Sequence, residues 1–106
     1  MPKYLFEMNY TAEGIKGVLD KGGSAREAAG REAVESVGGK LESYYYAFGG
    51  TDAFAICDLP DNAAAAALAM TVSSSGRVSC RTVVLMTPAE LDQAAGKHAT
   101  YSPPGG

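Results

Sequence analysis

The stretch GGTDAFAICDLPD, residues 49–61, decides the fold of this chain. The two glycines at its start predict a turn, and the apolar run from Ala53 to Leu59 predicts a central strand. Pro60 ends that strand, and Asp61 can begin a helix. A turn, a strand and a helix start within one short segment indicate the middle of a small α+β sandwich.

Composition limits what the chain can be. It has 106 residues, of which 46% are hydrophobic and 20% charged, which is typical of one globular domain. Its 9 basic and 12 acidic residues give a net charge of −3 and form no blocks, which argues against binding to nucleic acid or an anionic membrane. No apolar run approaches the roughly 20 residues that span a bilayer. Because the N-terminus does not resemble a signal peptide either, we expect a soluble cytoplasmic protein.

Periodicity and capping residues predict the elements on either side of the central strand. Residues 4–10 alternate in polarity, as a strand does. Thr11 is expected to cap a short helix that breaks at the glycine pair 22–23, and Ser24 to start a second helix through a capping box with Glu27. The expected strands are 4–10, 40–48, 53–59 and 78–86, and the later helices run from 61 or 62 to about 75 and from 88 to about 95.

This order predicts a ferredoxin-like βαββαβ sandwich with a short C-terminal helix and the spatial strand order 4-1-3-2. We expect crossovers to join strands one and three and strands two and four, with the central pair parallel. Residues 1–96 form the expected single domain, and residues 97–106 form a flexible tail.

The two cysteines and the single histidine predict no metal site and no cofactor. Cys57 and Cys80 lack metal-ligand spacing, and in this strand order another strand separates them, so they should remain reduced. His98 lies in the tail, where it cannot build a metal site alone.

Short motifs along residues 3–95 resemble the GYD domain family. The tyrosine-rich strand follows a Gly-Gly-Lys-Leu segment, and Thr51 stands where the family signature has tyrosine. The matching segments are Tyr10-Thr11-Ala12-Glu13-Gly14-Ile15, Gly38-Gly39-Lys40-Leu41 with Tyr44 to Tyr46, Gly50-Thr51-Asp52, Pro60-Asp61 and Thr87-Pro88-Ala89-Glu90. The resemblance implies a fold of the dimeric α+β barrel type, in which two sheets face each other, but it implies no activity.

A four-stranded sheet with helices on one face leaves the other face in water, which is costly if that face is apolar. We expect a second copy to cover it, in a homodimer or higher homo-oligomer. The residues expected there are Leu5, Glu7, Asn9, Phe54, Ile56, Asp58, Arg81, Val83 and Leu85. On the second strand, an odd number of loop residues would add Tyr44 and Tyr46, which we favour, and an even number Tyr45.

The charges on this face have three interpretations. Glu7, Asp58 and Arg81 form a structural ion pair that fixes the dimer, or they form the polar end of a pocket in which a carboxylate acts as base and Arg81 binds an anion. In the third interpretation they are solvent-exposed positions at the rim of the face. The predicted ligand-binding residues are Glu7, Asn9, Tyr44, Tyr46, Phe54, Asp58 and Arg81, and no catalytic residue is assigned.

The favoured function is a homo-oligomeric domain that binds a small molecule in a pocket between two sheets. The first alternative is a cofactor-independent monooxygenase or isomerase acting on an aromatic or polyketide-like substrate. The second is a regulatory module whose assembly responds to a ligand. Whether the chain is an enzyme stays open at this point.

Overall fold

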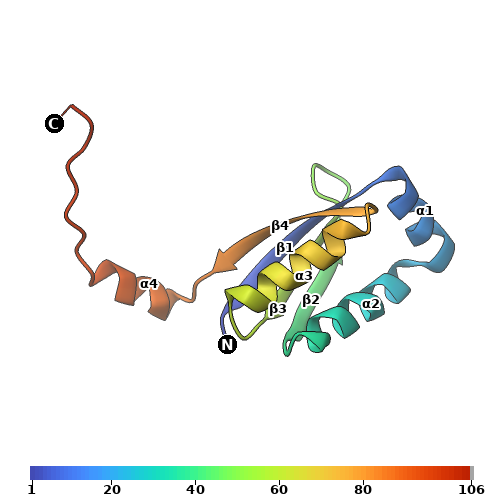
Figure 1. Cartoon of the computed structure of the whole chain (residues 1–106), viewed down its shortest axis with the longest axis horizontal. Helices are drawn as coiled ribbons and strands as arrows, with labels where there is room; N and C mark the ends of the chain where they lie inside the picture. Colours follow the sequence, from blue (N-terminus) through green and yellow to red (C-terminus); the bar gives the residue numbers. More distant parts are fainter. Residues whose placement is uncertain (106) are drawn as a thin grey trace.

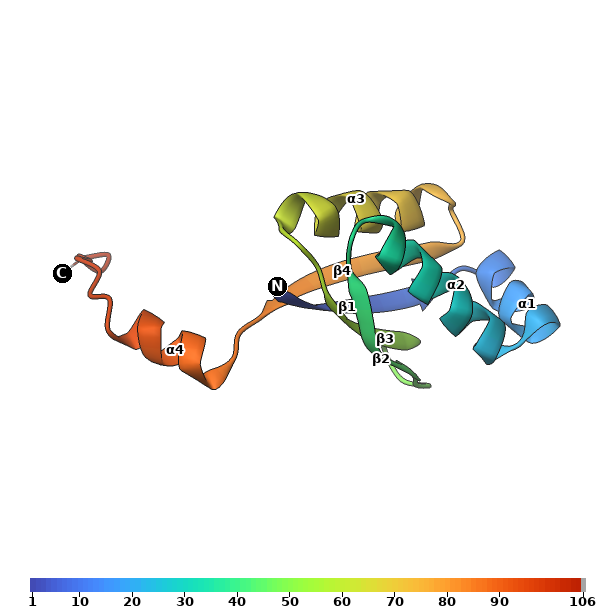
Figure 2. The same ribbon diagram turned by 90° about the horizontal axis from the view of Figure 1, so that it is seen from below.

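A computed structural model describes residues 1–105 of the chain. Four strands form one antiparallel sheet, α2 and α3 lie on one side of it, and α1 lies beyond one end of the sheet (Figures 1 and 2). The α+β class and ferredoxin-like topology predicted above are confirmed, including the strand order β2-β3-β1-β4. The elements are β1 (Lys3–Tyr10), α1 (Ala12–Lys21), α2 (Gly23–Ser36), β2 (Lys40–Tyr46), β3 (Ala53–Asp58), α3 (Asn62–Ser74), β4 (Val78–Leu85) and α4 (Pro88–Ala95).

The predicted strand directions are wrong at the centre of the sheet. β1 pairs with β3 in antiparallel fashion, and the β1–β4 and β2–β3 pairs are antiparallel too. The helical crossovers connect β1 to β2 and β3 to β4, so each passes over the strand that lies between the two it joins. Strands that run in the same direction are therefore never neighbours.

The first crossover is bent at Gly22, as expected. Gly22 has a φ of 88°, which a residue with a side chain rarely adopts. The predicted capping box of Ser24 and Glu27 is wrong, because α2 already begins at Gly23 with Gly22 as its N-cap and no side-chain cap. Ser24 therefore lies inside the first turn, two positions after the N-cap. The predicted caps Asp61 and Thr87 are confirmed at the starts of α3 and α4.

The hydrophobic core lies between the sheet and the pair α2 and α3. Tyr4, Cys57 and Leu59 are the largest side chains that are completely buried, and the Tyr4 hydroxyl donates a 2.6 Å hydrogen bond to the Asn62 side chain. The buried cluster contains Tyr4, Phe6, Val34, Leu41, Ala55, Cys57, Leu59, Ala65 and Leu68. All its sheet residues point toward the helices, so this core covers only one face of the sheet.

Thr11 ties the start of α1 to the segment before β4. Its backbone N–H donates to the Arg77 carbonyl at 2.9 Å, while its hydroxyl oxygen accepts the Gly14 N–H at 3.2 Å. Gly14 lies so close to this carbonyl that a Cβ atom there would overlap the Arg77 oxygen. The Tyr-Thr-x-x-Gly motif therefore has a packing role.

The C-terminal segment extends away from the sheet (Figures 1 and 2). Thr87 and Glu90 form the predicted capping box of α4, yet no residue of this helix is buried. Met86 and Leu91 are exposed by 52% and 60%. The expected division into a domain, 1–96, and a mobile tail, 97–106, stays a prediction, and position 106 lies outside the described residues.

Among residues 1–105, no helix combines the length and the apolar character needed to cross a bilayer.

We expect Gly14→Ala to lower the free energy of unfolding by about 1–3 kcal/mol, the range for overpacking a tight site. Gly17 lies in the same helix with no atom near its hypothetical Cβ. Gly17→Ala should therefore stabilise the protein by about 0.5–1 kcal/mol. Urea denaturation of both variants measures the difference. Equal effects of the two substitutions would contradict the close approach at Arg77.

Candidate functional site

The face of the sheet that carries no helix is the candidate site, and we call it the open face. Neighbouring residues of paired strands share a face, so the register determines which side chains lie there. Leu5 lies between Ile56 of β3 and Val83 of β4. These three side chains form an apolar row on the outside of the sheet, and Val83 is 38% exposed.

A second row crosses all four strands beside this apolar row. In spatial order it contains Tyr45, Phe54, Glu7 and Arg81. The two residues on β2 and β3 are aromatic, and the two on β1 and β4 carry a carboxylate and a guanidinium. Such a row can stack on a planar molecule and pair with its polar groups.

Our preferred register for β2 is wrong. The loop between Tyr46 and Ala53 has an even number of residues, 47–52, and the register pairs Tyr45 with Phe54. This is the alternative that places Tyr45 on the open face, where it is 69% exposed. Tyr44 and Tyr46 point to the helix side instead.

The contacts of these two tyrosines account for their orientation. The Tyr46 hydroxyl donates to the Gly23 carbonyl at 2.9 Å, and the Tyr44 hydroxyl lies 3.2 Å from that of Tyr10. The rings of Tyr44 and Tyr46 meet edge to face, with centroids 5.3 Å apart. Burial, followed by the hydrogen bond with Tyr10, raises the pKa of Tyr44 above the ordinary tyrosine value.

Two sets of ion pairs lie on the open face. Arg81 approaches Glu7 at 3.7 Å, and the arginine side chain is 72% exposed, so this pair contributes little to the stability of the single chain. Asp58 pairs with Lys3 at 2.9 Å rather than with Arg81. Lys3 also binds Glu42 at 3.0 Å, and the hydrogen bonds with Asp58 and then Glu42 raise the pKa of Lys3.

Sequence reasoning missed Lys3, although a signal was present. Lys3 continues the period-two spacing of Leu5, Glu7 and Asn9, and its register partner is Asp58. The open face therefore carries both charge signs on each side of its apolar row.

The Asn9 side chain stabilises the turn at residues 47–52 and does not lie at the centre of the open face. Its amide donates to the Gly50 carbonyl at 3.1 Å, and its side-chain oxygen accepts the Asp52 N–H at 3.1 Å. Asp52 in turn accepts the Tyr10 N–H at 2.9 Å. The side chain of Thr51 takes part in none of these bonds, so the turn of the family signature is held without it.

The cysteines are both free thiols, on strands that β1 separates. Burial raises the pKa of the Cys57 thiol to about 11, which makes it a weak nucleophile at neutral pH. Within residues 1–105, no group of three or more potential ligands could hold a metal ion, and His98 is exposed in the tail.

The open face thus unites Glu7, Phe54, Asp58 and Arg81 as predicted, and adds Tyr45 and Lys3. Asn9 lies at its edge, and Tyr44 and Tyr46 lie on the opposite face. The ligand-binding role of the seven predicted residues stays a prediction.

Comparison with known proteins gives one family. The model described as GYD domain matches residues 4–95, nearly all of the chain. Neither a curated protein nor a solved structure matches the chain.

Tyr44→Phe tests the placement of β2 through the pH dependence of stability. At neutral pH we expect Tyr44→Phe to lower the free energy of unfolding by about 1 kcal/mol, because the hydrogen bond between the Tyr44 and Tyr10 hydroxyls is lost. The folded protein holds the Tyr44 proton above pH 10 while the unfolded chain releases it, so the wild type loses stability as pH rises past about 10. Tyr44→Phe lacks this loss, so the difference between the two proteins should shrink between pH 9 and pH 11.

Tyr45→Phe is the matched control for this experiment. Among residues 1–105 the Tyr45 hydroxyl makes no hydrogen bond, and its side chain is 69% exposed in the single chain, so its substitution should change the free energy of unfolding less than Tyr44→Phe does at neutral pH. Urea midpoints measured across the pH range give the comparison. A larger effect of Tyr45→Phe than of Tyr44→Phe would contradict the register.

Proposed function

This protein belongs to the GYD domain family, and we propose that it is a homo-oligomeric binding domain whose open faces pair to enclose a small molecule. One observation carries the proposal. The apolar row of Leu5, Ile56 and Val83 lies on the side of the sheet that no helix covers. Complete burial of a fully exposed side chain of this kind contributes about 1.5–3 kcal/mol. The three side chains of the row are partly exposed in the single chain, so a partner that covers them gains a part of that amount from each.

The charge pattern supports a second copy as that partner. The open face carries Lys3 and Arg81 together with Glu7 and Asp58, so its positive and negative charges balance. Two inverted copies of such a face can place acid opposite base. A partner with one dominant charge sign would gain no such complementarity.

The C-terminal segment supports the same assembly. α4 has 8 residues, none of them buried, and isolated helices shorter than about 12–15 residues are marginal in water. Its capping box stabilises the first turn but provides no apolar burial. In the proposed oligomer, Met86 and Leu91 pack on the partner and α4 gains the contacts that it lacks in the single chain.

The binding site of this oligomer lies along the row of Tyr45, Phe54, Glu7 and Arg81. Facing sheets are about 10 Å apart, and large side chains normally fill that space. Ser43 and Ser79 are small and lie on the same face, next to the row, which leaves room there. The aromatic side chains and the ion pair suit a planar organic molecule with an anionic or polar substituent.

The same row also suits catalysis by a cofactor-independent isomerase or monooxygenase. Glu7 would act as the base, and Arg81, 3.7 Å from it, would stabilise a developing enolate or phenolate. Identification of the bound molecule, followed by a test for its turnover, separates this candidate from a binding module.

Val83→Lys should convert the oligomer to a monomer, because a buried unpaired charge at the interface costs far more than one surface contact contributes. Val84 is the matched control: it is the next residue of β4, it is 59% exposed, and it points to the other face. Sedimentation velocity should give a monomer for Val83→Lys and the wild-type oligomer for Val84→Lys. The opposite pattern would contradict pairing through the open face.

Arg81→Gln should abolish or reduce the retention of a co-purified small molecule. The expected observation is extra mass on the wild-type oligomer in native mass spectrometry, lost in Arg81→Gln. Arg31→Gln serves as control, because Arg31 is exposed on α2 and its ion-pair partner among residues 1–105 is Glu27, at 3.4 Å. Retention of the same mass by Arg81→Gln would contradict a site along this row.

A further inference from the structure

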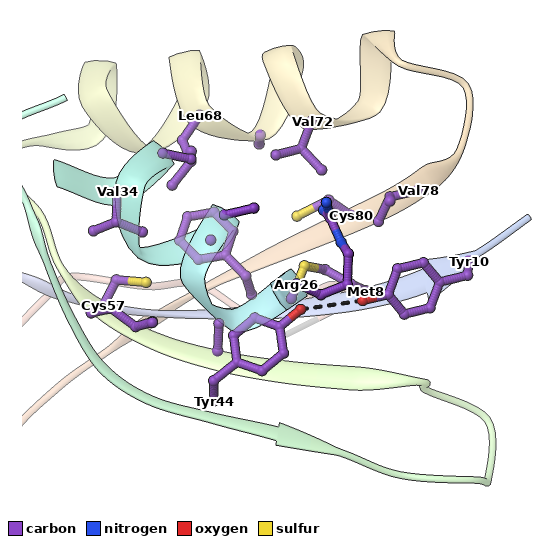
Figure 3. A pocket seen from close by; sticks show the side chains of 17 residues that line it. Met8, Tyr10, Arg26, Val34, Tyr44, Cys57, Leu68, Val72, Val78 and Cys80 are labelled. Carbon is purple, nitrogen blue, oxygen red and sulfur yellow. Dashed lines mark hydrogen bonds between the residues drawn. The ribbon is translucent and has the colours of Figure 1, made fainter. Parts of the chain in front are cut away.

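A pocket on the opposite side of the sheet is not explained by the oligomer. It lies between α2, α3 and the sheet (Figure 3). Its volume is about 90 Å³. We call it the helix-face pocket. Its floor includes Phe6, Met8 and Tyr44, and its helix walls include Ala29, Ala33 and Val72.

Small side chains create this pocket. α2 presents Ala29, Gly30 and Ala33 to it, and α3 contributes Ala69, so the helices leave space above the sheet. Protein interiors are normally close-packed, with few voids larger than a water molecule. An apolar cavity of about 150 Å³ is enough to admit benzene. The helix-face pocket is smaller than this but not closed, so it fits the apolar end of a ligand.

One end of the helix-face pocket is polar. The hydroxyls of Tyr10 and Tyr44 point toward each other, and Arg26 lies in the same part of the pocket (Figure 3). A hydrogen bond between two hydroxyls uses one proton, which leaves the other free to donate to a ligand. Within residues 1–105, no carboxylate lies within ion-pairing distance, 4.0 Å, of Arg26.

This polar end is also the mouth of the pocket. Tyr10, Arg26, Ala29 and Val78 line both the helix-face pocket and a wider groove beside α1. The charged side chains of that groove are Glu13, Lys16, Asp20, Lys21, Arg26 and Arg77. An amphiphilic molecule can therefore place its apolar end inside and its charged end at the mouth.

We propose that the helix-face pocket binds a small organic anion with an apolar end, an aromatic or short-chain carboxylate. Its apolar part lies on Met8 and Ala33, and its carboxylate meets Arg26 and the free tyrosine hydroxyl proton. This site is formed by one chain, and the sheet separates it from the open face. Its occupation therefore does not require the oligomer.

Benzoate titration followed by ¹H–¹⁵N NMR tests the proposal with a probe of the stated chemistry. We expect benzoate to shift the backbone signals of α2 and of β1 next to Met8. Benzyl alcohol has the same ring without the charge, and we expect it to bind at least about tenfold more weakly than benzoate. The reason is that a hydrogen bond to a charged group is stronger than one to a neutral group.

Two substitutions and a control locate the site. Ala29→Leu fills the pocket and should weaken benzoate binding more than tenfold, whereas Ala28→Leu, at the exposed neighbouring position, should not change it. Arg26→Gln keeps the apolar pocket and should remove the preference for benzoate over benzyl alcohol. This second variant keeps the test decisive if Ala29→Leu fails to fold.

Two results would overturn the proposal: no shift of the pocket signals at millimolar benzoate, or unchanged affinity and preference in Arg26→Gln. Val83→Lys distinguishes this site from the proposed oligomer. If the helix-face pocket acts alone, that variant should bind benzoate as the wild type does.

Discussion

Everything in this structure depends on a four-stranded sheet that its own helices cover on one side only. Both helical crossovers lie on the same face, so one set of alternating side chains enters the core and the other set faces outward. Tyr4 and Phe6 are buried, while Leu5 and Glu7 between and beside them point the other way. The sheet therefore offers two distinct surfaces, an open face with apolar and charged rows and a covered face with a pocket under the helices.

Two of the motifs that identify the family have structural roles. Thr11 and Gly14 dock α1 on the Arg77 carbonyl, and Asp52 with Asn9 holds the turn of the signature. Threonine stands at position 51, where the family signature has tyrosine. Because the Thr51 side chain makes none of these bonds, the fold tolerates this difference. The tyrosine-rich strand is different, because its residues face both surfaces: Tyr44 lines the helix-face pocket and Tyr45 lies in the row of the open face. This strand therefore contributes side chains to both candidate sites.

Much of the fold could be predicted from the sequence because the signals were local. Alternation gave β1, and capping residues gave the starts of α1, α3 and α4. The register of β2 could not be predicted, since it depends on the length of the loop 47–52 and on the irregularity between Leu41 and Ser43. A slip of one residue exchanges Tyr44 for Tyr45, and with them the composition of both sites. The helix-face pocket could not be predicted from the sequence either, because it arises from how α2 and α3 lie above the sheet and not from a motif.

The central claim is that a second copy covers the open face, and the particle mass of the wild-type protein in dilute solution tests it most directly. Light scattering coupled to size-exclusion chromatography measures that mass without a label. We expect a homodimer or a larger even-numbered oligomer at micromolar concentration. A particle with the mass of one chain would contradict it, because the row of Leu5, Ile56 and Val83 would then remain in water.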